Sequence, residues 1–279
     1  MPIHDQGYRR YQGGRTPDGR AWLVIARTGV RTLLARRQFV GLLLFAWLPF
    51  LVRAVQMYAA ANLPQAAFLA PTPGTFRQFL EQQEVFLFFI TVYAGAGLIA
   101  NDRRANALQI YLSKPLARVE YIFGKLAVLV TFMLLVTWVP AVLLLAVQIL
   151  FSGSFAFFTG NLRLFPAITV FALVQVLTVS SAMLALSSLS NSSRFVGILY
   201  AGLVFFSQAM FGILFAVTRD ARFSWISMPF NLRQAGDFIF GLPRRWDAPV
   251  AVSFLMLLLL VAASALVLDR RVRGVEVVR

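Results

Sequence analysis

Residues that could carry out chemistry are few in this sequence. The chain of 279 residues contains one histidine, His4, and no cysteine. A Ser-His-Asp arrangement for nucleophilic catalysis and a thiolate metal site are therefore not expected. Gly124-Lys125 is not a phosphate-binding loop, because no glycine-rich turn precedes it and no Ser or Thr follows it. The sequence thus predicts a protein that is not an enzyme and that holds no metal or cofactor of its own.

The charged residues that stand out lie between Asn101 and Lys125. Five of them are basic and two are acidic: Asp102, Arg103, Arg104, Lys114, Arg118, Glu120 and Lys125. An apolar run precedes this stretch at 85–100 and another follows it at 121–151. Two membrane spans should therefore hold the stretch at a membrane surface. A short loop so rich in Lys and Arg should face the cytoplasm.

The first half of this stretch has the pattern of a short amphipathic helix over 103–112. One stripe of that helix would carry Ala105, Leu108 and Leu112, and the other sides would carry Arg103, Asn106 and Gln109. Lys114-Pro115 should end the helix, because proline disfavours helical geometry in the residue before it. We therefore expect a short cytoplasmic helix with a defined end.

The stretch also resembles the coupling helix of ABC transporter permeases of the type-2 (ABC2-type) export class. In that family an acidic residue and a basic pair come before small residues and a leucine, and Leu-Ser-(basic)-Pro-Leu, an arginine, an aromatic residue and Gly-Lys follow. The matching residues here are Asp102, Arg103, Arg104, Leu108, Leu112, Ser113, Pro115, Arg118, Tyr121, Gly124 and Lys125. The chain departs from the family at Asn106-Ala107, where Gly-Thr is common. The alternative is a basic loop that only follows the positive-inside rule.

The resemblance implies a permease subunit of an ATP-driven exporter. A separate ABC ATPase subunit would bind ATP and Mg²⁺ and press on the coupling helix. The residues expected to couple to that ATPase are Asp102, Arg103, Arg104, Asn106, Leu108, Gln109 and Leu112. The resemblance also implies a second permease copy or a homologous permease, with a pathway at the dimer interface lined by the second and fifth spans. Two alternatives stay open, a stand-alone membrane enzyme acting on lipids and a membrane scaffold subunit.

Composition places the chain in a membrane. Hydrophobic residues make up 59% of it and charged residues 13%, whereas soluble domains average about 45–50% and about 25%. We predict an all-α polytopic fold with six spans at about 38–58, 85–100, 121–151, 166–189, 195–217 and 249–268. Basic residues cluster before the first span and after the last, so both termini should be cytoplasmic in the cell (inner) membrane. The net charge of +15 then reflects orientation and contact with anionic lipids, not nucleic acid.

The remaining segments have their own expected roles. Residues 1–19 should form a disordered cytoplasmic tail, and 20–279 a single transmembrane permease domain. Within that domain, 20–37 should be an amphipathic interfacial helix. The segment 75–84 should be a short helix in an outside loop, and 226–240 should be too short to cross the membrane.

Three residues inside the spans are candidates for the transport pathway. Ser207 and Gln208 lie near the middle of the fifth span, and Arg53 is the only charged residue that we place within any span. An intramembrane arginine can serve a pathway. It can also extend its head to the interface, and the depth of Arg53, about 22 Å along its helix, favours that second interpretation.

Overall fold

The computed structural model describes residues 20–107 and 117–272. Over these ranges the chain is helical and contains no β-strand. Six helical segments are long and apolar enough to cross a membrane: Arg37–Asn62, Pro73–Arg104, Arg118–Ser152, Leu164–Leu189, Ser193–Thr218 and Val250–Arg271. The predicted fold class and the six spans are confirmed. The tail over 1–19 lies outside the described residues.

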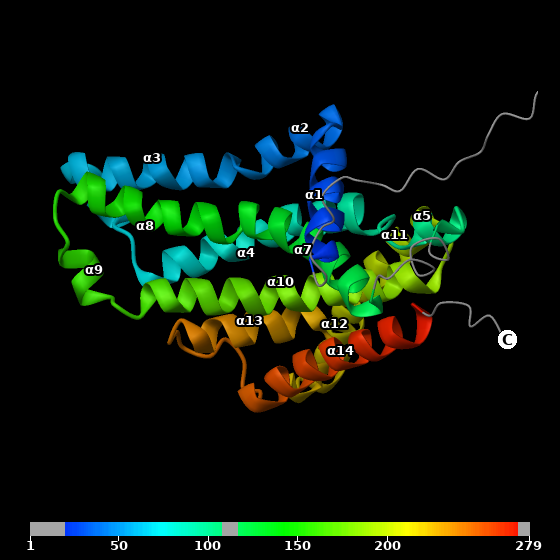
Figure 1. The fold of residues 1–279 in the computed structure, drawn as a ribbon. Helices are drawn as coiled ribbons and strands as arrows, with labels where there is room; N and C mark the ends of the chain where they lie inside the picture. Colours follow the sequence, from blue (N-terminus) through cyan, green and yellow to red (C-terminus); the bar gives the residue numbers. More distant parts are fainter. Residues whose placement is uncertain (1–19, 108–116, 273–279) are drawn as a thin grey trace, which may run out of the picture.

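The spans run side by side, and α1 (Ala21–Leu34) lies across one end of the bundle, roughly at right angles to them (Figure 1). We call this end the α1 end. The opposite end carries the short helix α9 (Ala156–Gly160), and we call it the α9 end. The predicted interfacial helix is thus present, although it stops at Leu34 and a turn separates it from the first span.

The first and third spans each break shortly before a proline. The first consists of α2 (Arg37–Ala46) and α3 (Leu48–Asn62), and the third of α7 (Arg118–Val136) and α8 (Trp138–Ser152). Pro49 and Pro140 follow the two breaks. Proline has no N–H to offer the carbonyl four residues back, so the helix loses a hydrogen bond there. At the first break, the buried Gln83 donates its Nε2 to the Ala46 carbonyl at 3.0 Å.

The second span is longer than the sequence predicted. It comprises α4 (Pro73–Ile90), the π-helical turn η2 (Thr91–Gly95) and α5 (Ala100–Arg104). Residues 75–84 are helical as predicted, but they form the beginning of α4 and continue into the second span, and do not make a separate helix in an outside loop. Between α3 and α4 lies only a short connection with the 3₁₀ turn η1 (Pro64–Leu69).

The second half of the chain completes the bundle. Its elements are α10 (Leu164–Leu189), α11 (Ser193–Ala201), the π-helical turn η3 (Gly202–Phe206), α12 (Ser207–Thr218), the 3₁₀ turn η4 (Ala221–Ile226), α13 (Met228–Ile239) and α14 (Val250–Arg271). The central helix is α10, where 72% of the most apolar window is buried, against 11% for the fifth span. As predicted for 226–240, α13 is too short to cross; it packs against α10 and α14.

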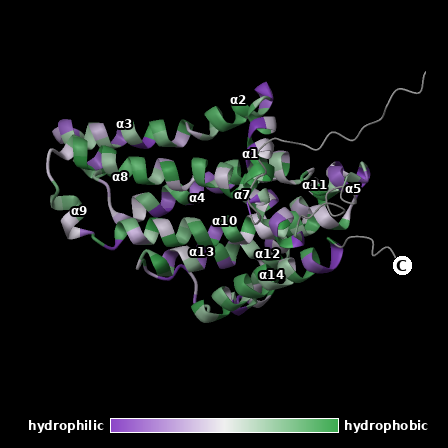
Figure 2. Cartoon of the chain, in the orientation of Figure 1, coloured by the Kyte–Doolittle hydropathy of each residue, from purple (hydrophilic) through white to green (hydrophobic). Residues whose placement is uncertain are grey.

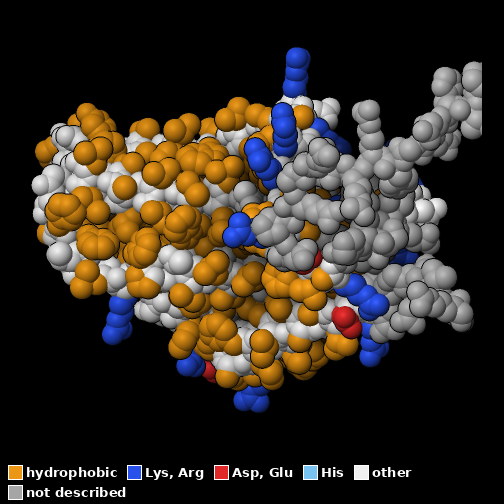
Figure 3. All heavy atoms as spheres, in the orientation of Figure 1, with side chains coloured by type: hydrophobic (Ala, Val, Ile, Leu, Met, Phe, Trp, Pro, Cys, Tyr) orange, Lys and Arg blue, Asp and Glu red, His pale blue; other side chains and the backbone are white. Residues whose placement is uncertain are grey.

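Polar and apolar surfaces separate along the bundle. Apolar residues cover most of the spans in Figures 2 and 3, and basic side chains gather toward the α1 end and along the lower edge of the view. A hydrocarbon core about 30 Å thick takes about 20 helical residues. Counted from Asn101 on the second span and from Arg270 on the sixth, the far boundary of that core falls near Glu81 and Val250. The first two turns of α4 then extend beyond the core, at the α9 end.

Candidate functional site

The charged stretch identified in the sequence begins at the α1 end with a tight contact between α5 and α7. The Asp102 carboxylate accepts a hydrogen bond from the Tyr121 hydroxyl at 2.7 Å. The same oxygen, Oδ2, lies 2.7 Å from the Lys125 ammonium. Tyr121 is fully buried, and the side chains of Asp102 and Lys125 are only 19% and 13% exposed. We call these three residues the α5–α7 clamp; it fixes the start of the charged stretch to the third span.

A second set of contacts fixes the same segment to α10. The Ser187 hydroxyl accepts from the backbone N–H groups of Ile99 and Ala100, both at 3.1 Å, and donates to the Ala96 carbonyl at 2.9 Å. The Arg103 guanidinium donates to the Ser188 carbonyl. Ser188 lies in the last turn of α10, where the negative end of the helix dipole stabilises a cation. Backbone groups at the interruption between η2 and α5 are thus hydrogen-bonded by the Ser187 side chain of the fourth span.

Beyond these contacts the segment turns outward. Arg104 and Asn106 are exposed, and α5 ends at Arg104. Asn106 has φ = 52°, in the left-handed region. The helix predicted over 103–112 is interrupted at Ala105 and Asn106, a residue type that tolerates this conformation, and Ala107 is helical again. The coupling residues Leu108, Gln109 and Leu112 lie outside the described residues.

The helix α1 rests on α7 through two glycines. A Cβ on Gly124 would lie 2.7 Å from the Ile25 Cβ and 3.0 Å from the Trp22 carbonyl oxygen, and one on Gly29 would lie 2.6 Å from a Val128 methyl group. Such spacing admits only glycine at the crossing. The Gly-Lys pair thus has two roles, because Gly124 admits α1 and Lys125 completes the α5–α7 clamp.

The three candidate pathway residues do not lie together. Arg53 is half-buried on α3 and its Nη1 donates to Gln56 Oε1 at 3.2 Å. Ser207 is buried and donates to the Val204 carbonyl at 3.2 Å. Two cavities lie between the fifth span and α13, and of these three residues only Gln208 lines them.

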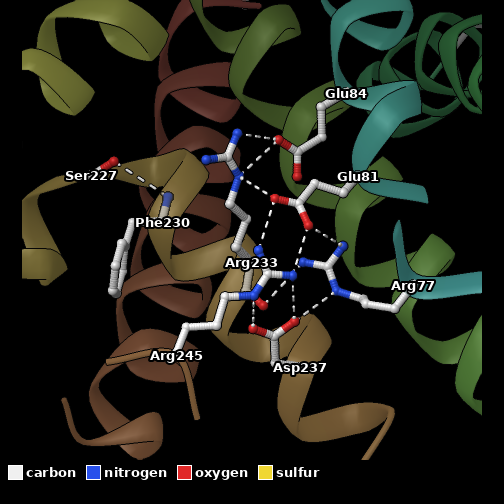
Figure 4. A network of polar contacts seen from close by, with 8 residues as sticks. All are labelled: Arg77, Glu81, Glu84, Ser227, Phe230, Arg233, Asp237 and Arg245. Carbon is white, nitrogen blue, oxygen red and sulfur yellow. Dashed lines mark hydrogen bonds and ion pairs between the residues drawn. The ribbon is translucent and has the colours of Figure 1, made fainter. Parts of the chain in front are cut away.

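A second polar site, not foreseen from the sequence, joins α4 to α13 and the loop that follows it (Figure 4). Its members are three arginines and three carboxylates: Arg77, Glu81, Glu84, Arg233, Asp237 and Arg245. We call this set the outer ion network. Arg233 Nη2 lies 2.9 Å from Glu84, and Arg245 contacts both Glu81 at 2.7 Å and Asp237 at 2.8 Å. The statement that Arg53 is the only charged residue of the spans is therefore wrong.

Arg77 is the most deeply buried member of the network, with no exposed side-chain surface. Its Nε lies 3.2 Å from Asp237, and its Nη2 donates to the Arg233 carbonyl at 3.1 Å. The guanidinium also stacks over the Phe171 ring, 4.7 Å from the centroid, a favourable cation–π distance. Burial raises the pKa of Asp237, and Arg77 and Arg245 oppose that shift.

One signal in the sequence could have indicated the network. Arg77 and Glu81 are four residues apart, and so are Arg233 and Asp237. This spacing places opposite charges on one face of a helix. On the sequence alone it is equally typical of a solvated helix surface, so the partner across the bundle could not be inferred.

Two cavities lie beside the outer ion network, and Arg233 and Gln208 border both. The larger, which we call cavity 1, has a volume of about 720 Å³ and lies between α12, α13 and the 241–250 segment. The smaller, cavity 2, has a volume of about 280 Å³ and lies between α4, α10, α13 and the fifth span. Gln175, 1% exposed, faces cavity 2 with both amide atoms unpaired among the described residues.

Comparison with known proteins adds no family assignment. No family profile matches the chain, and no curated protein sequence is significantly similar to it. Within 20–107 and 117–272, no group of three or more His, Cys, Asp or Glu side chains is arranged to hold a metal ion. The function is therefore inferred from the fold and its contacts.

Proposed function

We propose that this protein is the membrane-spanning subunit of an ATP-driven ABC transporter of the type-2 export class, coupled to a separate ATPase through the segment that begins at Asp102. The observation that carries the proposal is the α5–α7 clamp. Asp102, Tyr121 and Lys125 match the family motif by residue type and order, although they are up to 23 residues apart in the sequence. Their direct contact supports a motif that acts as one structural unit.

The backbone at Asn106 gives further support. The family commonly has glycine at this position, and glycine is the residue that most readily takes positive φ. Asn106 has φ = 52°, and asparagine is the next most tolerant residue. The departure from the family sequence is therefore compatible with the same backbone turn. A basic loop that only set orientation would have no need of a left-handed residue at this position.

The geometry suits the transmission of force. Arg104 and Asn106 are exposed at the α1 end, one to four residues beyond contacts that reach α7 through Asp102 and α10 through Arg103. A partner that pushed on the exposed turn would therefore act on three spans at once. In this proposal ATP and Mg²⁺ belong to the ATPase subunit, and a second permease copy or a homologous permease completes the transporter.

The direct test is purification of the tagged chain from its native membranes. We expect an ATPase subunit with a phosphate-binding loop to copurify and the complex to hydrolyse ATP. Arg104→Glu should lose that subunit while the chain still inserts, because the change reverses a charge on the exposed turn without touching the clamp. Arg270→Glu, an exposed arginine at the same end on α14, is the matched control.

The rival functions predict different outcomes. A stand-alone lipid enzyme would act on lipid without an ATPase, and a scaffold would bind partners whose recovery does not depend on Arg104. Equal recovery of the ATPase with both variants would contradict coupling through this segment. Absence of any ATPase from the purified wild-type protein would contradict the transporter proposal itself.

A further inference from the structure

Cavity 1 has the size and wall of a site for an amphiphile. Its volume of about 720 Å³ lies in the range of about 300–1,000 Å³ typical of ligand sites. Four aromatic rings form one connected wall: Phe211, Phe215, Phe230 and Trp246. The ring centroids of Phe211 and Phe230 are 4.8 Å apart, as are those of Phe215 and Trp246. This wall offers apolar contact to a chain or ring of a bound molecule.

The charge at the mouth of cavity 1 is positive. Arg233, Arg244, Arg245 and Asp237 line it. In the outer ion network three guanidinium groups face three carboxylates, so its charges cancel. Arg244 is exposed and stands outside that balance, since it has no ion pair or hydrogen bond to any part of the chain that the structure describes. A bound anion would therefore meet one uncompensated guanidinium.

The cavity also lies at the depth of a lipid headgroup. Phe211 is 18 residues beyond Ser193, which begins the fifth span, and thus about 27 Å along the helix. This is close to the far boundary of a core about 30 Å thick. Trp246 and Arg244 both line the cavity, and Trp and Arg are typical of a membrane interface. The fifth span is also the least buried of the six.

We propose that cavity 1 binds a membrane lipid with an anionic headgroup. Arg244 contacts the headgroup phosphate, for which arginine is well suited, and an acyl chain lies against the aromatic wall beside Trp246. A zwitterionic lipid would bring its own cation to the same guanidinium and would bind less well. This inference does not depend on an ATPase partner.

The test uses the full-length protein in vesicles of phosphatidylcholine. Increasing fractions of phosphatidylglycerol or phosphatidylcholine with brominated chains are introduced, and tryptophan fluorescence is measured. Bromine quenches a nearby indole, and the difference between wild type and Trp246→Phe isolates the signal of Trp246. We expect half-maximal quenching at about fivefold less phosphatidylglycerol than phosphatidylcholine, the preference that one arginine near an anionic surface typically confers.

Two variants test whether Arg244 causes the preference for phosphatidylglycerol. Arg244→Gln should abolish it while leaving Trp246 quenchable by both lipids. Arg222→Gln should keep it, because Arg222 is an exposed arginine of η4 that does not line the cavity.

Four results would each overturn the proposal. The first is equal quenching of Trp246 by phosphatidylglycerol and phosphatidylcholine, and the second is an equal loss of preference in Arg244→Gln and Arg222→Gln. The third is displacement of the lipid by inorganic phosphate. The fourth is protection of Trp246 from both lipids, together with cross-linking between two copies of the chain through α12. The last would identify a second copy of the chain as the occupant.

Discussion

At the scale of single residues, Arg77 has the most demanding environment in the molecule. It is a fully buried guanidinium whose charge is balanced only by side chains of the outer ion network. Removing one partner of a buried ion pair leaves the other charge uncompensated, which costs more than the pair contributes. The network therefore acts as a unit that holds α4 against α13, and its members should not behave independently.

We predict that Arg77→Met destabilises the protein by about 3–5 kcal/mol, as is typical of a broken buried pair. The measurement is unfolding in mild detergent as the fraction of SDS is raised. The double change Arg77→Met, Asp237→Asn should recover part of the loss, because the four remaining charges again cancel. Arg222→Met, at an exposed pair with 4.0 Å between Arg222 and Asp220, should cost no more than about 1 kcal/mol. Additive losses in the double variant would contradict a coupled network.

Gly236 provides a second test at this scale, because it admits the Arg77 side chain. A Cβ at this position would lie 2.5 Å from Arg77 Nε and 2.8 Å from Phe171 Cε2. We predict that Gly236→Ala costs about 1–3 kcal/mol through overpacking, although alanine is the better helix former. Gly41→Ala, where a Cβ would meet nothing within 4 Å, should be neutral or slightly stabilising in the same assay. Equal effects of the two changes would show that Arg77 can move aside.

At the scale of elements, the six spans could be predicted, and the length of the second span could not. Hydropathy identifies runs of apolar residues, and α10 and α14 are such runs. The beginning of α4 carries Arg77, Glu81 and Glu84, so its composition matches that of a loop. It is buried against α3, α8 and α10. The compensating charges come from α13 and the loop after it, which are far away in the sequence. Pairing of this kind is a tertiary property that a local pattern does not contain.

The candidate site at the α1 end could be predicted only in part, because its contacts are also tertiary. Residue types and order indicated a unit that begins at Asp102, but not the contact of its carboxylate with Tyr121 and Lys125. The sequence predicts that Arg103 faces a partner, whereas its guanidinium donates to the Ser188 carbonyl of α10. The helical period over 103–112 is regular, so nothing in that pattern foretold the left-handed turn at Asn106.

The packing of α1 against α7 can be tested at this scale. We predict that Gly124→Leu displaces α1, because the new side chain would meet the Trp22 backbone oxygen as well as Ile25. Amide hydrogen exchange over 21–34 should then accelerate, since the helix loses its packing partner. Gly41→Leu on α2 is the matched control and should leave this exchange unchanged. Unchanged exchange in Gly124→Leu would mean that α1 is held mainly by the membrane surface.

At the scale of the whole molecule, the distribution of charge distinguishes the two ends. The α1 end carries Arg103, Arg104 and Lys125 beside the bundle, with Arg270 and Arg271 at the end of α14. Toward the α9 end, Arg77, Arg233 and Arg245 are paired with carboxylates in the outer ion network. An excess of Lys and Arg near span ends determines orientation. The α1 end should therefore face the cytoplasm, which the proposed contact with an ATPase also requires.

Orientation can be measured directly, because the chain has no native cysteine. We predict that a single cysteine at Ala67, exposed in η1 at the α9 end, reacts with a membrane-impermeant maleimide in intact cells. Cysteines at Ala107 and Val275 should react only after the cells are permeabilised. Each position comes shortly after a cluster of arginines at the end of a span, and such clusters stay on the cytoplasmic side. Permeabilisation also serves as the control, since it separates a cysteine hidden by the membrane from one hidden by the fold. Labelling of Ala107→Cys from outside intact cells would reverse the orientation of the bundle and place the exposed turn at Asn106 where no ATPase could reach it.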